Sequence, residues 1–230
     1  MKVHELHEWD VTPARAREIQ ENLRDQVQLT PLKTDVNVVV GADVSYTRGD
    51  SRLFAGVVVM KVPEMEILET RSVSLDVKFP YIPGYLSFRE VPPLLQAFRD
   101  LRAKPDALIC DGAGLAHPRF FGLACHLGMI LNIPSFGCAK TYLVGEYKEP
   151  ANRRWSATKL KHGGRDVGLV VRTREAVKPV YLSPGHLIDA EGSLAVLKKC
   201  VGRYRLAEPV RKAHDLVNDE RRDFFSRNRS

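Results

Sequence analysis

Residues 107–140 read ALICDGAGLAHPRFFGLACHLGMILNIPSFGCAK. The segment opens with Ala107–Cys110, an apolar run short enough to be a strand buried on both faces. A glycine-rich loop over 112–116 follows, and then a mostly apolar stretch of helical length over 119–131. A second short run, 135–140, completes the segment. This order predicts a βαβ unit with two parallel strands.

Asp111 and Lys140 stand at the ends of these two predicted strands. The carboxyl ends of parallel strands form the rim at which ligands bind in such units. A carboxylate and an ammonium group are therefore expected beside each other at that rim. We interpret the pair as the start of a functional site.

The chain has 230 residues, a formal net charge of +7 and 44% hydrophobic residues. This length without a Ser/Gly/Pro-rich linker predicts a single domain over 1–230. No apolar run reaches the length of a membrane span, and the first residues lack the apolar core of a signal peptide. The basic balance favours a polyanionic partner such as nucleic acid, with no membrane partner.

The four cysteines are spaced without a C-x-x-C pattern, and two of them fall in predicted buried strands. They are Cys110, Cys125, Cys138 and Cys200. Reduced thiols in a hydrophobic core are favoured over disulfides or a zinc site. This usage is typical of a cytoplasmic protein.

Three further strands are expected before the central unit, over 36–42, 53–62 and 65–75. The short turns between them predict an antiparallel meander. Asp43 follows the first apolar run within its strand, where a carboxylate has a desolvation cost unless it is paired or bound to a cation. A helix is expected ahead of the meander, over about 12–28, with Thr12-Pro13 at its start.

Ser87 and Glu90 match a capping box before a helix that carries Leu94 and Leu95. Pro92-Pro93 conflicts with this, because proline fits only the first turn of a helix. The helix is then expected to begin near Val91, which leaves Glu90 free for another role.

Downstream of the central unit, several further elements are expected. We expect an irregular basic segment over 145–166, strands over 167–172 and 179–183, helices over 188–200 and from about 208, and a solvated basic tail over 219–230 with Arg221, Arg222, Arg227 and Arg229. A meander feeding a parallel pair, flanked by helices, is the mixed α/β arrangement of the ribonuclease H-like fold. Other α/β topologies share these features, so the fold does not decide the function.

In a ribonuclease H-like arrangement, Asp43, Glu90 and Asp111 converge. Three close carboxylates repel one another and ionise together only with a cation between them. Their oxygens are hard ligands suited to Mg²⁺ or Mn²⁺, which also bind phosphate and activate water. Taken singly, each acid could cap a turn, helix or loop. Together with Lys140 and His214 they favour a metal site.

The chain resembles the endonuclease V family over most of its length. The matching segments are Gly41–Tyr46, Pro80–Gly84 with Phe88–Glu90, Asp111–Pro118, Gly137–Lys140 and Pro209–His214. The resemblance implies a Mg²⁺-dependent repair nuclease that recognises inosine, with Mn²⁺ able to substitute. It also implies hydrolysis of the second phosphodiester bond 3′ to the lesion, leaving 3′-hydroxyl and 5′-phosphate ends.

By position, the resemblance implies that Asp43, Glu90 and Asp111 bind the metal and that Lys140 and His214 assist catalysis. Tyr81 would be a wedge that enters the base stack, stiffened by its loop. That loop consists of Pro80, Tyr81, Ile82, Pro83 and Gly84. The extruded hypoxanthine would be bound near Leu86, Gly112, Gly114, His117 and Gly122. Without the resemblance, an aromatic residue packed on the sheet is the favoured interpretation of Tyr81.

Basic side chains would contact the phosphate backbone. The candidates are Arg48, Lys78, Arg119, Arg153, Arg154 and Lys159. We expect a monomer acting on deoxyinosine-containing DNA, with inosine-containing RNA left open. The alternatives are a structure-selective nuclease without base recognition, a non-catalytic nucleic-acid-binding protein, and a phosphohydrolase for small nucleotides.

Overall fold

In the computed structural model, residues 1–227 are described, and they form five helices around one nine-stranded mixed sheet. The strands are β1 (Val38–Tyr46), β2 (Arg52–Lys61), β3 (Glu66–Asp76), β4 (Ala107–Cys110), β5 (Ser135–Ala139), β6 (Glu146–Tyr147), β7 (Ala157–His162), β8 (Arg165–Val171) and β9 (Val180–His186). The helices are α1 (Pro13–Arg24), α2 (Leu86–Arg99), α3 (Leu123–Leu131), α4 (Ala190–Cys200) and α5 (Glu208–Arg227).

The strand order is β3-β2-β1-β4-β5-β9-β8-β7-β6. The three central strands β1, β4 and β5 are parallel, whereas β2 and β3 form an antiparallel meander on one side. On the other side β9 is antiparallel to β5. The predicted meander, the βαβ unit and the ribonuclease H-like class are therefore confirmed.

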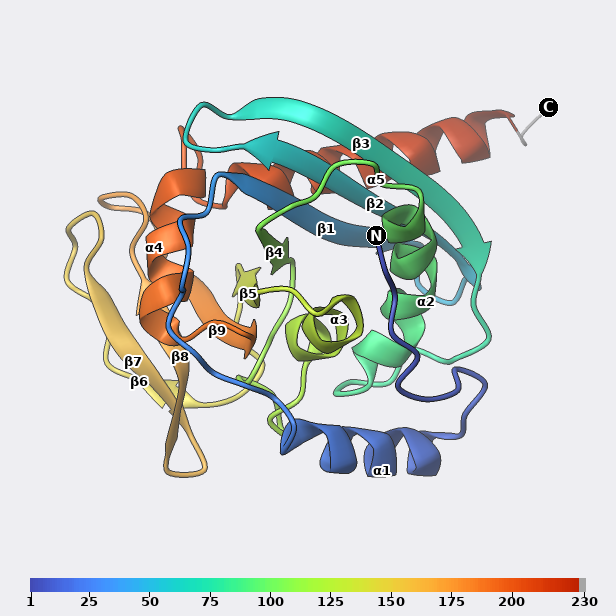
Figure 1. Cartoon of the computed structure of the whole chain (residues 1–230), viewed down its shortest axis with the longest axis horizontal. Helices are drawn as coiled ribbons and strands as arrows, with labels where there is room; N and C mark the ends of the chain where they lie inside the picture. Colours follow the sequence, from blue (N-terminus) through green and yellow to red (C-terminus); the bar gives the residue numbers. More distant parts are fainter. Residues whose placement is uncertain (228–230) are drawn as a thin grey trace.

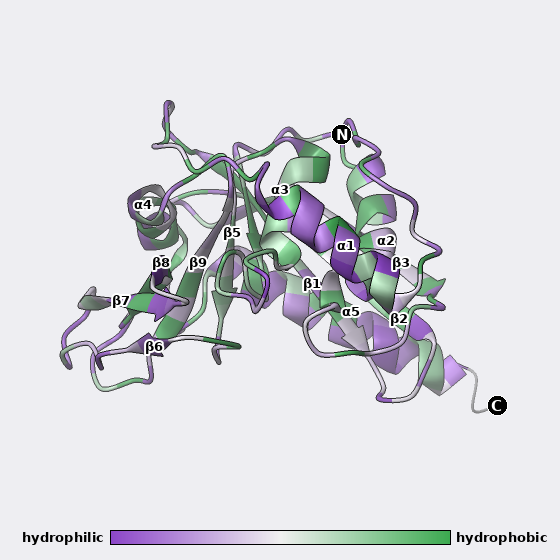
Figure 2. Cartoon of the chain, turned by 90° about the horizontal axis from the view of Figure 1, so that it is seen from below, coloured by the Kyte–Doolittle hydropathy of each residue, from purple (hydrophilic) through white to green (hydrophobic). Residues whose placement is uncertain are grey.

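Helices cover both faces of the central strands, which explains why β4 is apolar at every position (Figure 1). Successive residues of β1 point to opposite faces. Val40 packs in the core that includes Leu94 of α2 and Leu127 of α3, and Val39 packs in the core that includes Val210 of α5. Every residue of α3 except Met129 is buried, in keeping with its hydrophobic colour in Figure 2, where α1 and α5 carry hydrophilic faces.

Helix α2 begins at Leu86, five residues before the start expected near Val91, and the capping box is wrong. The Ser87 hydroxyl pairs with His126 Nδ1 at 3.0 Å instead of capping the helix. Ten of the fourteen residues of α2 are buried, so packing outweighs the local cost of Pro92 and Pro93 inside the helix.

The segment over 145–166 is not wholly irregular, because β6, β7 and the start of β8 lie within it. Helix α3 begins at Leu123, four residues later than expected, and α1 ends at Arg24. The Thr12 hydroxyl accepts from the Arg15 N–H at 3.3 Å, as expected of a cap. Helix α5 continues through the expected tail to Arg227; Arg229 lies outside the described residues.

All four cysteines are buried free thiols, as expected. Within residues 1–227, the helices are too short or too polar to cross a membrane.

Candidate metal and nucleic-acid site

Asp43 and Asp111 lie on adjacent parallel strands at the carboxyl edge of the sheet. Cys110, the last residue of β4, is in register with Ala42 of β1. The Asp111 N–H then donates to the Ala42 carbonyl at 3.2 Å. The strand register thus places the two carboxylates beside each other, with Asp43 inside β1 and Asp111 directly after β4.

Helix α5 brings His214 to this pair by direct contact with the backbone of β1. A Cβ on Gly41 would lie 2.1 Å from the carbonyl carbon of Pro209, so only glycine permits this approach. About one and a half turns further along the helix, His214 Nδ1 lies 2.7 Å from Asp43 Oδ2. Asp43 Oδ1 accepts from the Val44 N–H at 2.8 Å.

Asp43, Asp111 and His214 each offer a metal-binding atom, and these atoms lie within 4.8 Å of one another. Burial, followed by the Asp111 charge, raises the pKa of Asp43 to about 6, although the His214 hydrogen bond opposes the shift. Burial also raises the pKa of Asp111, and the Lys140 charge opposes that shift. Two carboxylates whose ionisation is unfavourable without a cation fit a hard divalent ion.

Glu90 lies on α2, buried among the same charges. Burial raises its pKa well above the ordinary value, and the charges of Asp43 and Asp111 raise it further. Within residues 1–227 its carboxylate makes no hydrogen bond. Glu90 is not in the group whose ligand atoms lie within 4.8 Å of one another, but the charges of Asp43 and Asp111 reach its buried carboxylate, which a bound cation would stabilise.

Lys140 follows directly after β5 and lines a pocket of about 450 Å³ together with Asp111. Two residues expected to bind the base, Leu86 and Gly112, also line this pocket. The acidic cluster therefore adjoins a mainly apolar recess, and base binding by Leu86 and Gly112 stays a prediction.

Gly114 and Gly122 serve close backbone packing. A Cβ on Gly114 would lie 2.0 Å from the Pro184 carbonyl oxygen, and one on Gly122 would lie 2.4 Å from that of Ala113. These contacts fold the loop after β4 against β9 and against itself. Direct contact of either glycine with a base stays a prediction.

The loop that carries Tyr81 is fixed at its C-terminal end. The Gly84 carbonyl accepts from Gln20 Nε2 at 3.1 Å, from His117 Nε2 at 2.9 Å and from the Arg119 guanidinium. Because a carbonyl only accepts, His117 carries its proton on Nε2, and its Nδ1 accepts from the Arg119 N–H. Burial lowers the pKa of His117 to about 4, which agrees with this neutral form. Tyr81 itself is 58% exposed.

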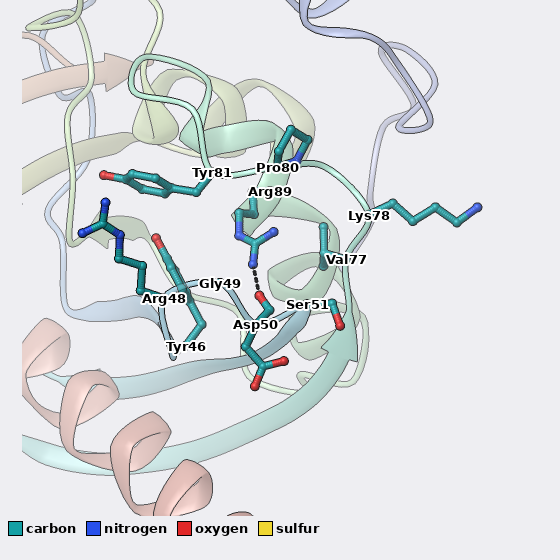
Figure 3. A pocket seen from close by; sticks show the side chains of 10 residues that line it. All are labelled: Tyr46, Arg48, Gly49, Asp50, Ser51, Val77, Lys78, Pro80, Tyr81 and Arg89. Atoms are coloured by element: carbon teal, nitrogen blue, oxygen red, sulfur yellow. Dashed lines mark hydrogen bonds between the residues drawn. The ribbon is translucent and has the colours of Figure 1, made fainter.

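Arg89 fixes the other end of the same loop. Its guanidinium donates to the Phe79 carbonyl at 2.6 Å and to the Asp50 carbonyl at 2.5 Å, and it lies 5.2 Å from the Tyr46 ring. Tyr46 and Tyr81 line a pocket of about 670 Å³, with ring centroids 6.3 Å apart (Figure 3). The exposed tyrosine therefore projects from a loop held at both ends.

Of the basic residues expected to contact phosphate, Arg48 and Lys78 line the pocket beside Tyr81. Arg119 turns inward to Gly84, and Lys159 pairs with Asp166 at 2.5 Å. Gln20 has no role in the sequence-based predictions, because it stands out there only as a polar residue beside the apolar stripe of α1.

The family model for endonuclease V matches residues 21–215. The endonuclease V of Roseiflexus castenholzii is 44% identical over 221 residues, which are 96% of this chain and 99% of that protein. The solved structure of endonuclease V from Bacillus subtilis matches with a TM-score of 0.93 and 30% identity, over 99% of this chain and 100% of that one.

A third similar protein is endonuclease V from Ciona intestinalis, solved in complex with a 24mer DNA containing an inosine followed by a ribo-adenosine. It matches with a TM-score of 0.80 and 25% identity, over 92% of this chain and 98% of that one.

Proposed function

The chain belongs to the endonuclease V family, and from this premise we propose that it is a Mg²⁺-dependent endonuclease that recognises inosine in nucleic acid. It hydrolyses the second phosphodiester bond 3′ to the lesion and leaves 3′-hydroxyl and 5′-phosphate ends. The observation that carries the proposal is made at the carboxyl edge of the sheet. A carboxylate cluster, a lysine and an exposed tyrosine on a loop held at both ends are found there.

Asp43, Asp111 and Glu90 would hold the ion, and His214 offers a further ligand atom beside Asp43 and Asp111. A bound Mg²⁺ or Mn²⁺ would supply Lewis acidity toward a phosphate oxygen and lower the pKa of a bound water. Since His214 donates from Nδ1 to Asp43, its Nε2 is free to accept a proton when the ring is neutral. The Lys140 ammonium, which lines the same pocket as Asp111, would donate to a phosphate oxygen as negative charge develops.

Two parts of the site would recognise the base: the loop of Tyr81 and the pocket that Asp111 lines. Tyr81 would fill the space that the extruded nucleotide leaves, because an aromatic ring stacks on any base. Leu86 and Gly112 would contact the hypoxanthine in the pocket beside Asp111. The Ciona intestinalis complex with inosine-containing DNA supports this substrate class.

The test uses an end-labelled duplex with one central inosine and a matched guanosine duplex, each with Mg²⁺ or with EDTA. The proposal expects a Mg²⁺-dependent nick one nucleotide beyond the inosine and none in the control. Equal cutting of both duplexes would indicate a structure-selective nuclease, and binding without cutting would indicate a non-catalytic protein. An RNA version of the substrate decides between DNA and RNA preference.

A further inference from the structure

Besides Tyr81, a second exposed tyrosine lies near the acidic cluster, in the pocket that Asp111 lines. Tyr142 is 48% exposed and lies two residues after Lys140, on the connection between β5 and β6. It is not part of any segment that carries the family resemblance. An exposed aromatic ring beside a catalytic lysine is available to a ligand.

Two other tyrosines hold the ring of Tyr142 in place. Its centroid lies 5.1 Å from that of Tyr181 on β9 and 5.5 Å from that of Tyr147 on β6, the latter at an interplanar angle of 86°. The hydroxyls of Tyr147 and Tyr181 are hydrogen-bonded at 2.8 Å. The ring is therefore supported from two strands, and its ordering costs less on binding than that of a free side chain.

Tyr142 also lines the same pocket of about 450 Å³ as Asp111 and Lys140. On its other walls this pocket has Leu86 and Gly112, and its volume falls within the range of small-ligand sites. An aromatic face, an aliphatic side chain and open backbone together form the surroundings that a flipped base requires. Here the pocket reaches directly to the carboxylate that would hold the metal.

We propose that Tyr142 is a base-binding residue that holds the extruded purine in this pocket by stacking on it. This inference rests on the proposed function and extends it: Tyr81 fills the vacated stack, and Tyr142 receives the base that has left it. Tyr147 and Tyr181 act as positioning residues. Within residues 1–227 the Tyr142 hydroxyl makes no hydrogen bond, so Tyr142→Phe removes no contact within the described protein and tests the ring face alone.

The experiment compares Tyr142→Ala and Tyr142→Phe with the wild-type protein in single-turnover cleavage of the inosine duplex with Mg²⁺. Loss of one base–aromatic stack is expected to slow Tyr142→Ala by roughly 5- to 150-fold at subsaturating protein, and Tyr142→Phe should stay within about twofold of wild type. Tyr204→Ala is the matched control, because Tyr204 is 47% exposed but stacks on Arg211 instead of lining the pocket.

Binding of the guanosine duplex in EDTA separates base stacking from backbone contact. Its affinity should be equal for wild type and Tyr142→Ala, because no base is extruded. Two results would overturn the assignment of Tyr142 and leave the proposed function intact. One is an affinity of Tyr142→Ala that falls by the same factor for the inosine and the guanosine duplex. The other is a Tyr142→Ala cleavage rate within about twofold of a wild-type protein that cleaves. A wild-type protein that does not cut at inosine overturns the proposed function and the assignment with it. A phenylalanine variant as slow as the alanine variant also overturns base stacking.

Discussion

Replacing Asp43 by asparagine is expected to stabilise the protein in EDTA while it abolishes cleavage. Burial and the Asp111 charge raise the pKa of Asp43 from 3.8 to about 6. Ionising this carboxylate in the folded protein therefore costs about 3 kcal/mol relative to the unfolded chain above about pH 7. Asparagine avoids that cost. Its amide oxygen can accept from Val44, and its N–H can donate to His214 Nδ1 when the imidazole carries its proton on Nε2 instead.

The pH dependence of this gain follows from the direction of the pKa shift. Because the folded-state pKa of Asp43 is the higher one, the penalty is absent below the ordinary pKa of 3.8 and grows as the pH rises through about 6. For a chain of this size about 3 kcal/mol corresponds to a rise in Tm of roughly 6–12 °C above about pH 7. The measurement is thermal unfolding in EDTA across this range, with the exposed Asp25→Asn, next to Arg24, as the control.

In Mg²⁺ the wild-type protein, and not Asp43→Asn, should have the higher Tm. The ion stabilises the wild-type fold in proportion to its binding and should stabilise Asp43→Asn little. A Tm of Asp43→Asn below that of wild type above about pH 7 in EDTA would show that ionised Asp43 does not destabilise the fold. So would a difference in Tm that is the same below the ordinary pKa as above about pH 7, because a fixed difference has no ionisation behind it.

Substitutions at three further positions test other residues in and around the site. Gln20→Ala removes a buried donor to the Gly84 carbonyl. The rate of inosine cleavage should therefore fall several-fold in a kinetic assay. The free energy of unfolding, measured by urea denaturation, should fall by about 1–3 kcal/mol. Lys140→Met should lower the single-turnover rate at least about 100-fold. Because the Lys140 charge lowers the pKa of Asp111, the acid limb of the pH–rate profile should move to higher pH, and Lys140→Arg should leave it in place. Gly41→Ala forces a Cβ onto the α5 backbone, so Tm should fall in EDTA and in Mg²⁺ alike, by the equivalent of about 1–3 kcal/mol or more.

The central strands and the strand end that Asp111 follows were predictable, because continuous apolar runs and the rim rule of parallel sheets are local signals. Asp43 was noticeable for a different reason, as a carboxylate inside an apolar strand. Lys140 was predictable for the same reason. Other parts of the structure depend on contacts between distant segments. Gln20 and the Gly84 carbonyl, for example, are 64 positions apart in the sequence.

Two errors have a common cause, namely tertiary packing that local rules do not contain. The prolines of α2 argued for a late helix start, yet Phe88 and Leu94 are fully buried and hold the earlier turns in helical form. In β7 only Leu160 is buried, so this strand near the sheet edge lacks the apolar pattern that marks the central strands.

Arg89 and Glu90, consecutive on α2, connect the two halves of the site. The Glu90 carboxylate faces the charges of Asp43 and Asp111, whereas the Arg89 guanidinium holds the loop of Tyr81 through the Phe79 carbonyl. Both side chains are buried, so neither can shift without displacing the helix turn they share. The carboxylate cluster and the tyrosine loop are therefore kept at a fixed separation by one rigid turn. A nuclease that cuts at a set distance from the base it recognises requires such a constraint, because a displacement of about 1 Å at the reacting phosphate is enough to cost roughly 100-fold in rate.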